Sequence, residues 1–135
     1  MSFDAARQAL FTLVQSVWTT AGAPVPLEYQ NLEMIDMNSR ADPFLACEIV
    51  FREALQVSLE SSPRTRYFGE LNLYVHVKDG QGTKAAMGYC GTFASGLKYQ
   101  RVSGVQLQAP RLKPTLKLTG WTVWVLSVSF QYDEL

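Results

Sequence analysis

The chain has 135 residues, of which 47% are hydrophobic and 12% aromatic, and its 12 acidic and 12 basic side chains balance. This composition is typical of a globular domain with its own core, and it excludes a mainly disordered chain. No apolar run approaches the roughly 20 residues of a transmembrane helix, and no signal peptide is evident, so we expect one cytosolic domain over residues 1–135 without a membrane partner.

The charges are unevenly distributed along the chain. Residues 1–79 hold ten acids and six bases, whereas residues 80–132 hold six bases and no acid. Two interpretations stay open. Folding can interleave the two parts, or it can leave one acidic and one basic face suited to contacts between copies of the chain.

Apolar residues at spacings of three and four predict an amphipathic helix over residues 4–20, with Asp4 as its N-cap. The apolar stripe consists of Phe3, Ala6, Leu10, Leu13, Val14, Val17 and Trp18. Gly22, Pro24 and Pro26 end the helix, and the prolines hold residues 25–31 extended, as in a short strand.

Residues 32–43 combine turn formers with apolar side chains, among them Met34 and Met37. Such side chains are poorly placed in open solvent. We therefore expect this connection to lie against the domain or against a neighbouring subunit.

Residues 44–60 and 67–78 alternate apolar and polar side chains with the period of two that strands require. The apolar positions are Leu45, Cys47, Ile49, Phe51, Leu55, Val57 and Leu59 in the first segment, and Leu71, Leu73, Val75 and Val77 in the second. The link SSPRTR predicts an antiparallel hairpin. Its tip, with Arg64 and Arg66, should project from the body.

A second helix is predicted from its N-cap Thr83 to Leu97. Its stripe is Ala86, Cys90, Phe93 and Leu97, and its interruptions are Gly88, Gly91 and Gly96, which are tolerated where a helix packs closely on a sheet. A basic loop is then predicted from Pro110 to Pro114. It contains Arg111 and Lys113, which are candidate contacts together with Lys117 beyond it.

The segment WTVWVLSVSFQY, residues 121–132, predicts the strand on which the core is built. One face is dry throughout: Trp124, Leu126, Val128, Phe130 and Tyr132. The other face becomes polar toward its end: Trp121, Val123, Val125, Ser127, Ser129 and Gln131. If no helix of the same chain covers Trp121, this side of the strand is a candidate contact with a neighbouring subunit or a tube.

The order of elements predicts an α+β fold, in which two helices pack on one face of a mainly antiparallel sheet of about four or more strands. Catalytic groups are sparse: His76 is the only histidine and lies on a polar strand face, and Cys47 and Cys90 lie on apolar faces without a CxxC motif. We therefore expect buried free thiols, no metal or cofactor, and no enzymatic activity.

Several segments together resemble the tail-terminator (minor tail protein U-like) proteins of long-tailed bacteriophages and prophages. They are the N-terminal helix, PVPLEYQN, LACEIVF, GELNLYVHVKDGQGT before a short helix, and GWTVWVLSVSFQYDEL. The resemblance covers nearly the whole chain and rests on the order and spacing of these segments. The connection 32–43 departs from it.

The resemblance implies a non-enzymatic virion protein, six copies of which form a ring that caps the finished tail tube, stops its polymerisation and presents a surface for head–tail joining. The implied partners are further copies of the chain, the tube protein and the head connector protein, with weak, sequence-blind DNA contact in the lumen. The implied location is the virion tail, and the host cytoplasm during assembly.

Two alternatives stay open. One is another neck or connector protein of a phage particle. The other is a single-stranded nucleic-acid-binding module, in which interleaved aromatic and basic residues would contact bases and phosphates. Its residues would be Tyr89, Phe93, Lys98, Tyr99 and Arg101.

Overall fold

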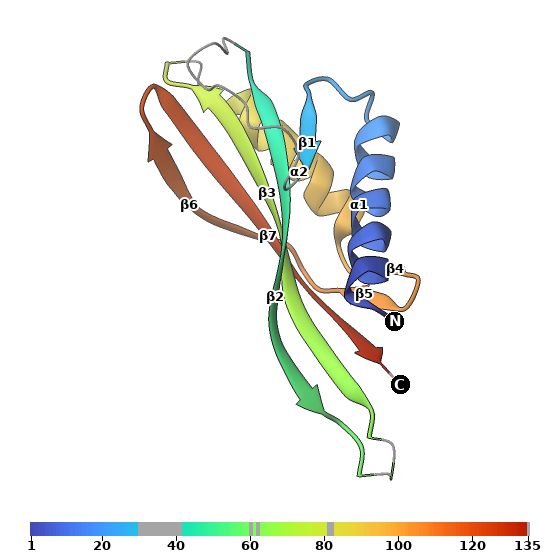
Figure 1. The fold of residues 1–135 in the computed structure, drawn as a ribbon. Coiled ribbons are helices and arrows are strands. Elements are labelled where there is room, and N and C mark those ends of the chain that lie inside the picture. Colours follow the sequence, from blue (N-terminus) through green and yellow to red (C-terminus); the bar gives the residue numbers. More distant parts are fainter. Residues whose placement is uncertain (30–41, 60, 62, 81–82, 135) are drawn as a thin grey trace.

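Two helices lie against one face of a strongly twisted sheet in the computed structural model, which describes residues 1–29, 42–59, 61, 63–80 and 83–134 (Figure 1). The helices are α1 (Phe3–Thr20) and α2 (Lys84–Leu97). The strands in the described part are β1 (Leu27–Tyr29), β2 (Phe44–Gln56), β3 (Thr65–Lys78), β4 (Arg101–Val102), β5 (Val105–Leu107), β6 (Arg111–Leu118) and β7 (Trp121–Glu134). The α+β class and the placement of both helices on one face are confirmed.

The centre of the sheet is the antiparallel pair β3 and β7, which pair from Thr65 and Glu134 to Lys78 and Trp121. Strand β2 pairs antiparallel with the other edge of β3, and β5 and β6 follow one another along the other edge of β7. The short β1 runs parallel to β2, so the sheet is mixed rather than purely antiparallel. Side-chain alternation predicts a strand but carries no information about its direction.

The core lies between the helices and the helix-facing side of the sheet. The buried stripe of α1 is Ala6, Leu10, Val14 and Trp18, that of α2 is Ala86, Cys90, Phe93 and Leu97, and that of β7 is Leu126, Val128, Phe130 and Tyr132. Trp124 is half-buried against this core. The helical stripes are confirmed at these buried positions, and the dry face of β7 is confirmed from Leu126 onward.

Neither of the two predicted residues caps its helix through its side chain. The α1 cap is Ser2, whose Oγ accepts a hydrogen bond from the Ala5 amide at 3.1 Å, while Asp4 lies in the first turn and pairs with Arg7. Thr83 does occupy the N-cap position of α2, but its side chain makes no capping hydrogen bond. Its backbone is already helical, whereas a capping side chain needs an extended backbone at that residue.

The glycines of α2 have a different role from the one expected. A Cβ on Gly96 would lie 2.6 Å from Cγ1 of Val17, so the close approach joins α2 to α1 rather than to the sheet. A Cβ on Gly88 or Gly91 would meet nothing within 4 Å. Only Gly96 is therefore required for packing.

The predicted loop from Pro110 to Pro114 is wrong, because residues 111–118 form strand β6 against β7. Pro114 has no N–H to donate and is confined to sheet edges or irregular positions. Pro114 meets both conditions, because β6 is an edge strand and the register shifts between Lys113 and Leu116. Long-range pairing with β7 outweighs the local preference of the prolines.

The hairpin of β2 and β3 is confirmed, but its predicted dry face ends at Ile49. The register shifts between Phe51 and Glu53, and Leu55 then pairs with Arg66 on the side of the sheet away from the helices, which we call the outer face. Beyond this shift the hairpin runs alongside the end of β7, and its tip projects past the helices and past both termini (Figure 1). We call this projecting part, residues 53–59 and 63–68, the arm.

Candidate functional site

The contact candidates Arg111 and Lys113 lie in one ion-pair cluster centred on Glu70. The Glu70 carboxylate accepts from Arg52 Nη2 at 3.0 Å and Lys113 Nζ at 3.2 Å, and Arg111 Nη2 lies 3.5 Å away. The Glu70 side chain is only 15% exposed. The hydrogen bond from Arg52, and then the hydrogen bond and the charge of Lys113, hold the pKa of Glu70 below its ordinary value, so the carboxylate stays charged.

Lys117 is held in a second cluster near the end of β3. Its Nζ donates to Asp79 Oδ1 at 3.1 Å and lies 2.7 Å from Thr122 Oγ1, which itself donates to Asp79 at 2.8 Å. The hydrogen bond from Thr122, followed by that from Lys117, lowers the pKa of Asp79.

These two clusters join the acidic and the basic part of the chain. Glu70 and Asp79 belong to the acidic first part of the chain, and Arg111, Lys113 and Lys117 to the basic second part. Folding therefore interleaves the two parts at these residues. Each of these three bases has an acidic partner within one copy of the chain.

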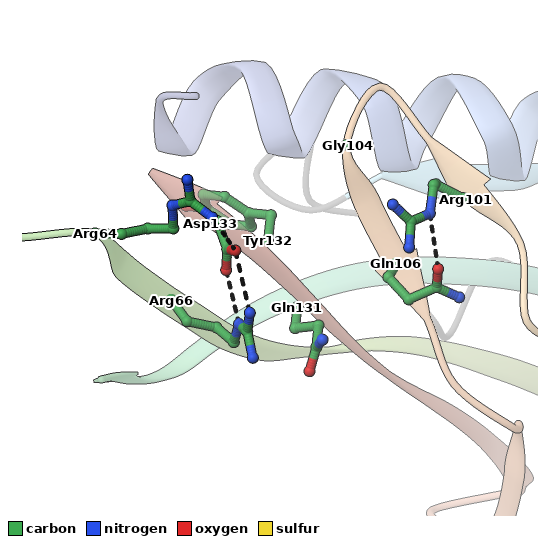
Figure 2. A pocket seen from close by; sticks show the side chains of 8 residues that line it. All are labelled: Arg64, Arg66, Arg101, Gly104, Gln106, Gln131, Tyr132 and Asp133. Carbon is green, nitrogen blue, oxygen red and sulfur yellow. Dashed lines mark hydrogen bonds and ion pairs between the residues drawn. The ribbon is translucent and has the colours of Figure 1, made fainter. Parts of the chain in front are cut away.

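The predicted hairpin-tip residues Arg64 and Arg66 lie in the second segment of the arm, beside the end of β7 (Figure 2). Arg66 donates two hydrogen bonds to Asp133, from Nε to Oδ1 at 2.7 Å and from Nη2 to Oδ2 at 3.1 Å. Arg64 Nη1 lies 4.0 Å from the same carboxylate. The hydrogen bond from Arg66 lowers the pKa of Asp133.

A cavity of about 490 Å³ opens next to this pair on the outer face. Its lining comprises Arg64, Arg66, Arg101, Gly104, Gln106, Gln131, Tyr132 and Asp133. Sequence reasoning placed Arg101 in a different site and missed Gln106, Gln131 and Asp133. The one local signal was the Ser103-Gly104 turn between β4 and β5, where both residues have positive φ, 47° and 86°, as a tight hairpin turn requires.

Trp121, Val123 and Val125 lie on the outer face, where no helix covers them, yet they are 3%, 1% and 5% exposed. The Trp121 ring packs edge-on against Phe44, with ring centroids 5.5 Å apart, and Lys78 Nζ lies over it at 5.5 Å. Trp121 is thus buried within the single chain. Met34 and Met37 lie outside the described residues.

The groups considered for catalysis are separate from one another. Cys47 and Cys90 are buried free thiols, as expected, and burial raises the pKa of Cys90 to about 11 and that of Cys47 further. His76 is half-buried and stacks on Phe44 at 4.2 Å. Among the described residues, no group of three or more His, Cys, Asp or Glu side chains could hold a metal ion.

The five residues proposed for nucleic-acid binding are not one surface. Phe93 is fully buried, and Tyr89 packs edge-on against Trp18 with centroids 5.6 Å apart. Tyr99 is 59% exposed, and Lys98 and Arg101 are exposed beside it. Of the three aromatic rings proposed to stack on bases, only that of Tyr99 is therefore freely exposed.

The fold and these surfaces define an α+β protein with charged clusters on the outer face of its sheet and an apolar projecting arm. Within the described residues, no helix is long and apolar enough to cross a membrane. No protein-family model matches the chain, and no curated protein matches it. A solved structure without a descriptive name aligns over 100% of this chain and 98% of its own, with a TM-score of 0.73 and 13% sequence identity. At this identity the similarity shows the fold alone.

Proposed function

We propose that this chain is a structural, non-enzymatic virion protein. Its copies form a ring, a hexamer in this proposal, that caps a phage tail tube, ends its polymerisation and provides the surface for head–tail joining. The resemblance of its sequence segments to tail terminators motivates the proposal. Its partners would be other copies of the chain, the tube protein and the head connector, first in the host cytoplasm and then in the virion tail.

The arm is the observation that best supports an assembly role. Its side chains Leu55, Val57 and Leu59 are 57%, 36% and 98% exposed. Monomeric proteins rarely expose clustered large apolar side chains, and burying one leucine contributes about 1.5–3 kcal/mol. A projecting segment with this composition is suited to contact another chain.

The arm also has a suitable shape and free backbone groups. Strand β1 pairs with β2 only from Leu45 to Cys47, so the same edge of β2 has no strand partner farther along, in the described part of the chain. Unpaired strand edges are sites of association. The arm lies at one end of the molecule (Figure 1). A neighbour that meets it with a different surface would make a heterologous contact, and such contacts can close into a ring.

The oligomeric state with and without an intact arm tests this proposal. Sedimentation velocity and light scattering should show a concentration-dependent ring for the wild type and a monomer for the double variant Leu55→Ser and Leu59→Asp. Leu112→Ser is the matched control, because Leu112 is 48% exposed but lies on β6. An unaltered ring in the arm variant would remove the arm from assembly.

Electron microscopy distinguishes a terminator from another neck protein. The wild type, mixed with preformed tail tubes or with filled heads of a cognate phage, should bind the tube end and stop further growth of the tube. Binding only to heads would exclude the terminator and favour the alternative neck or connector role.

A further inference from the structure

The cavity beside Asp133 has cationic groups on two sides. In Figure 2, Arg64 and Arg66 lie on one side of Gln131, and Arg101 lies with Gln106 on the other. The lining residues come from the segment that leads into β3, from the end of β7 and from the β4–β5 hairpin, which the sheet brings together although they are separate in the sequence.

Arg101 is held in place by a contact that leaves its Nη donors free. Arg101 Nε donates to Gln106 Oε1 at 2.9 Å, and the Gln106 amide in turn donates to the carbonyls of Tyr99 and Leu107, at 3.3 and 3.0 Å. The Nη groups of Arg101 have no hydrogen bond to any described residue. Because Arg101 is anchored through Nε, less side-chain freedom is lost when its Nη groups bind a ligand.

The charges around the cavity do not balance. Three guanidinium groups line it, and Asp133 is the one carboxylate in its lining. Both Asp133 oxygens are taken by Arg66, while Arg64 is at the 4.0 Å limit of an ion pair. Asp79, by contrast, has a single lysine partner, and the three bases around Glu70 all lie within 3.5 Å of its carboxylate. The cavity therefore keeps a local excess of two positive charges.

We propose that this cavity binds a ligand with successive phosphate groups, one held by Arg64 and Arg66 and another by Arg101. Guanidinium groups match phosphate oxygens with paired hydrogen bonds. Because the cations lie on both sides of Gln131, a ligand with several anionic groups uses both sides, whereas a single phosphate uses one. This chemistry is shared by free polyphosphate and by the backbone of a nucleic acid, and the site does not depend on the proposed ring.

Calorimetric titration of the full chain at low ionic strength tests the site with inorganic phosphate, tripolyphosphate and a short oligothymidylate. Tripolyphosphate is expected to bind more tightly than phosphate. Arg101→Gln should weaken it by about fivefold, the upper range for one exposed ion pair. Lys84→Gln is the matched control, because Lys84 is an exposed base at the start of α2, outside this cavity.

A substitution of Asp133 is expected to change the affinity in the opposite direction. Asp133→Asn removes the competing carboxylate, so it should tighten tripolyphosphate binding, whereas general damage to the end of β7 would weaken it. Circular dichroism and thermal unfolding would verify that each variant stays folded.

Competition between tripolyphosphate and the oligonucleotide assigns the source of the phosphates. Tighter binding of the oligonucleotide, lost in Arg101→Gln, would indicate a nucleic-acid backbone, and the reverse would indicate free polyphosphate. Absence of binding by both probes would overturn the proposal. Equal weakening by Arg101→Gln and Lys84→Gln would also overturn it, because the attraction would then be unspecific.

Discussion

At the scale of single residues, Glu70 has the largest share of the charge pairing on the outer face. Arg52, Arg111 and Lys113 come from two different strands and converge on this one carboxylate, which is largely shielded from solvent. Partly buried ion pairs of this kind are screened less by salt than pairs in open solvent. Glu70 therefore links β2, β3 and β6 electrostatically.

Glu70→Gln should lower the free energy of unfolding by about 1 kcal/mol at pH 7, because three cations lose their common partner. The folded pKa of Glu70 is lowered, so its contribution is present above the unfolded-state pKa, about 4.3, and is lost as the pH falls through the folded value. Urea unfolding at pH 7 and pH 3 would measure it. A stability difference that persists unchanged at pH 3 would contradict an electrostatic origin.

The α2 glycines give a matched pair of substitutions. Gly91→Ala should stabilise the protein by roughly 0.5–1 kcal/mol, because alanine restricts the unfolded chain and its Cβ meets open space. Gly96→Ala should destabilise it, because the same methyl group would overlap with Val17. Chemical unfolding midpoints of the two variants should move in opposite directions, and equal shifts would refute the assigned contact.

At the scale of elements, β7 contributes buried side chains to both faces of the sheet. Its helix-facing side chains belong to the main core, and on the outer face Trp121, Val123, Val125 and Ser127 are also buried. The sequence predicts that this second face becomes polar toward its end, and the burial of its first half agrees with that pattern, whereas Ser127 is polar but fully buried. Side chains of neighbouring strands cover this part of the outer face, as Phe44 and Lys78 do at the Trp121 ring.

Val128→Asp should prevent stable folding, because Val128 is fully buried in the core and an unpaired carboxylate there costs several kcal/mol. Val128→Ala, which removes volume without adding a charge, should fold with reduced stability. Circular dichroism and thermal melting would compare them. A folded Val128→Asp variant with a wild-type melting temperature would contradict the central role of β7.

At the scale of the whole molecule, ion pairs join acidic and basic segments that are distant in the sequence. On the sequence alone, reversing Arg111 and Lys113 to glutamate would be expected to impair assembly without affecting the fold. The Glu70 cluster changes this expectation, because two new acids would face a carboxylate of 15% exposure.

The double variant Arg111→Glu and Lys113→Glu should therefore be less stable as a monomer. Combined with Glu70→Gln, it should lose less than the sum of the separate effects, with a coupling of about 0.5–1 kcal/mol. Urea unfolding of the four proteins completes this cycle. Strict additivity would show that the two bases act independently of Glu70.

The sequence by itself determined the α+β class, both helices, the hairpin and the strand β7. These features follow from local periodicity: spacings of three and four place Leu10 and Phe93 in the core, and alternation places Leu73 and Val128 there. Reading such local patterns requires no information about which segments of the chain pack together. The same applies to the buried state of Cys47 and Cys90.

Only the tertiary structure decided the parallel pairing of β1, the strand conformation of β6, and the register shift that turns Leu55 to the outer face. It also decided which acid each base contacts, and it brought the arginines of the cavity together from two separate segments of the chain. The physical reason is the same in each case. These features depend on hydrogen bonds and charges between residues far apart in the chain, and local periodicity carries no information about them.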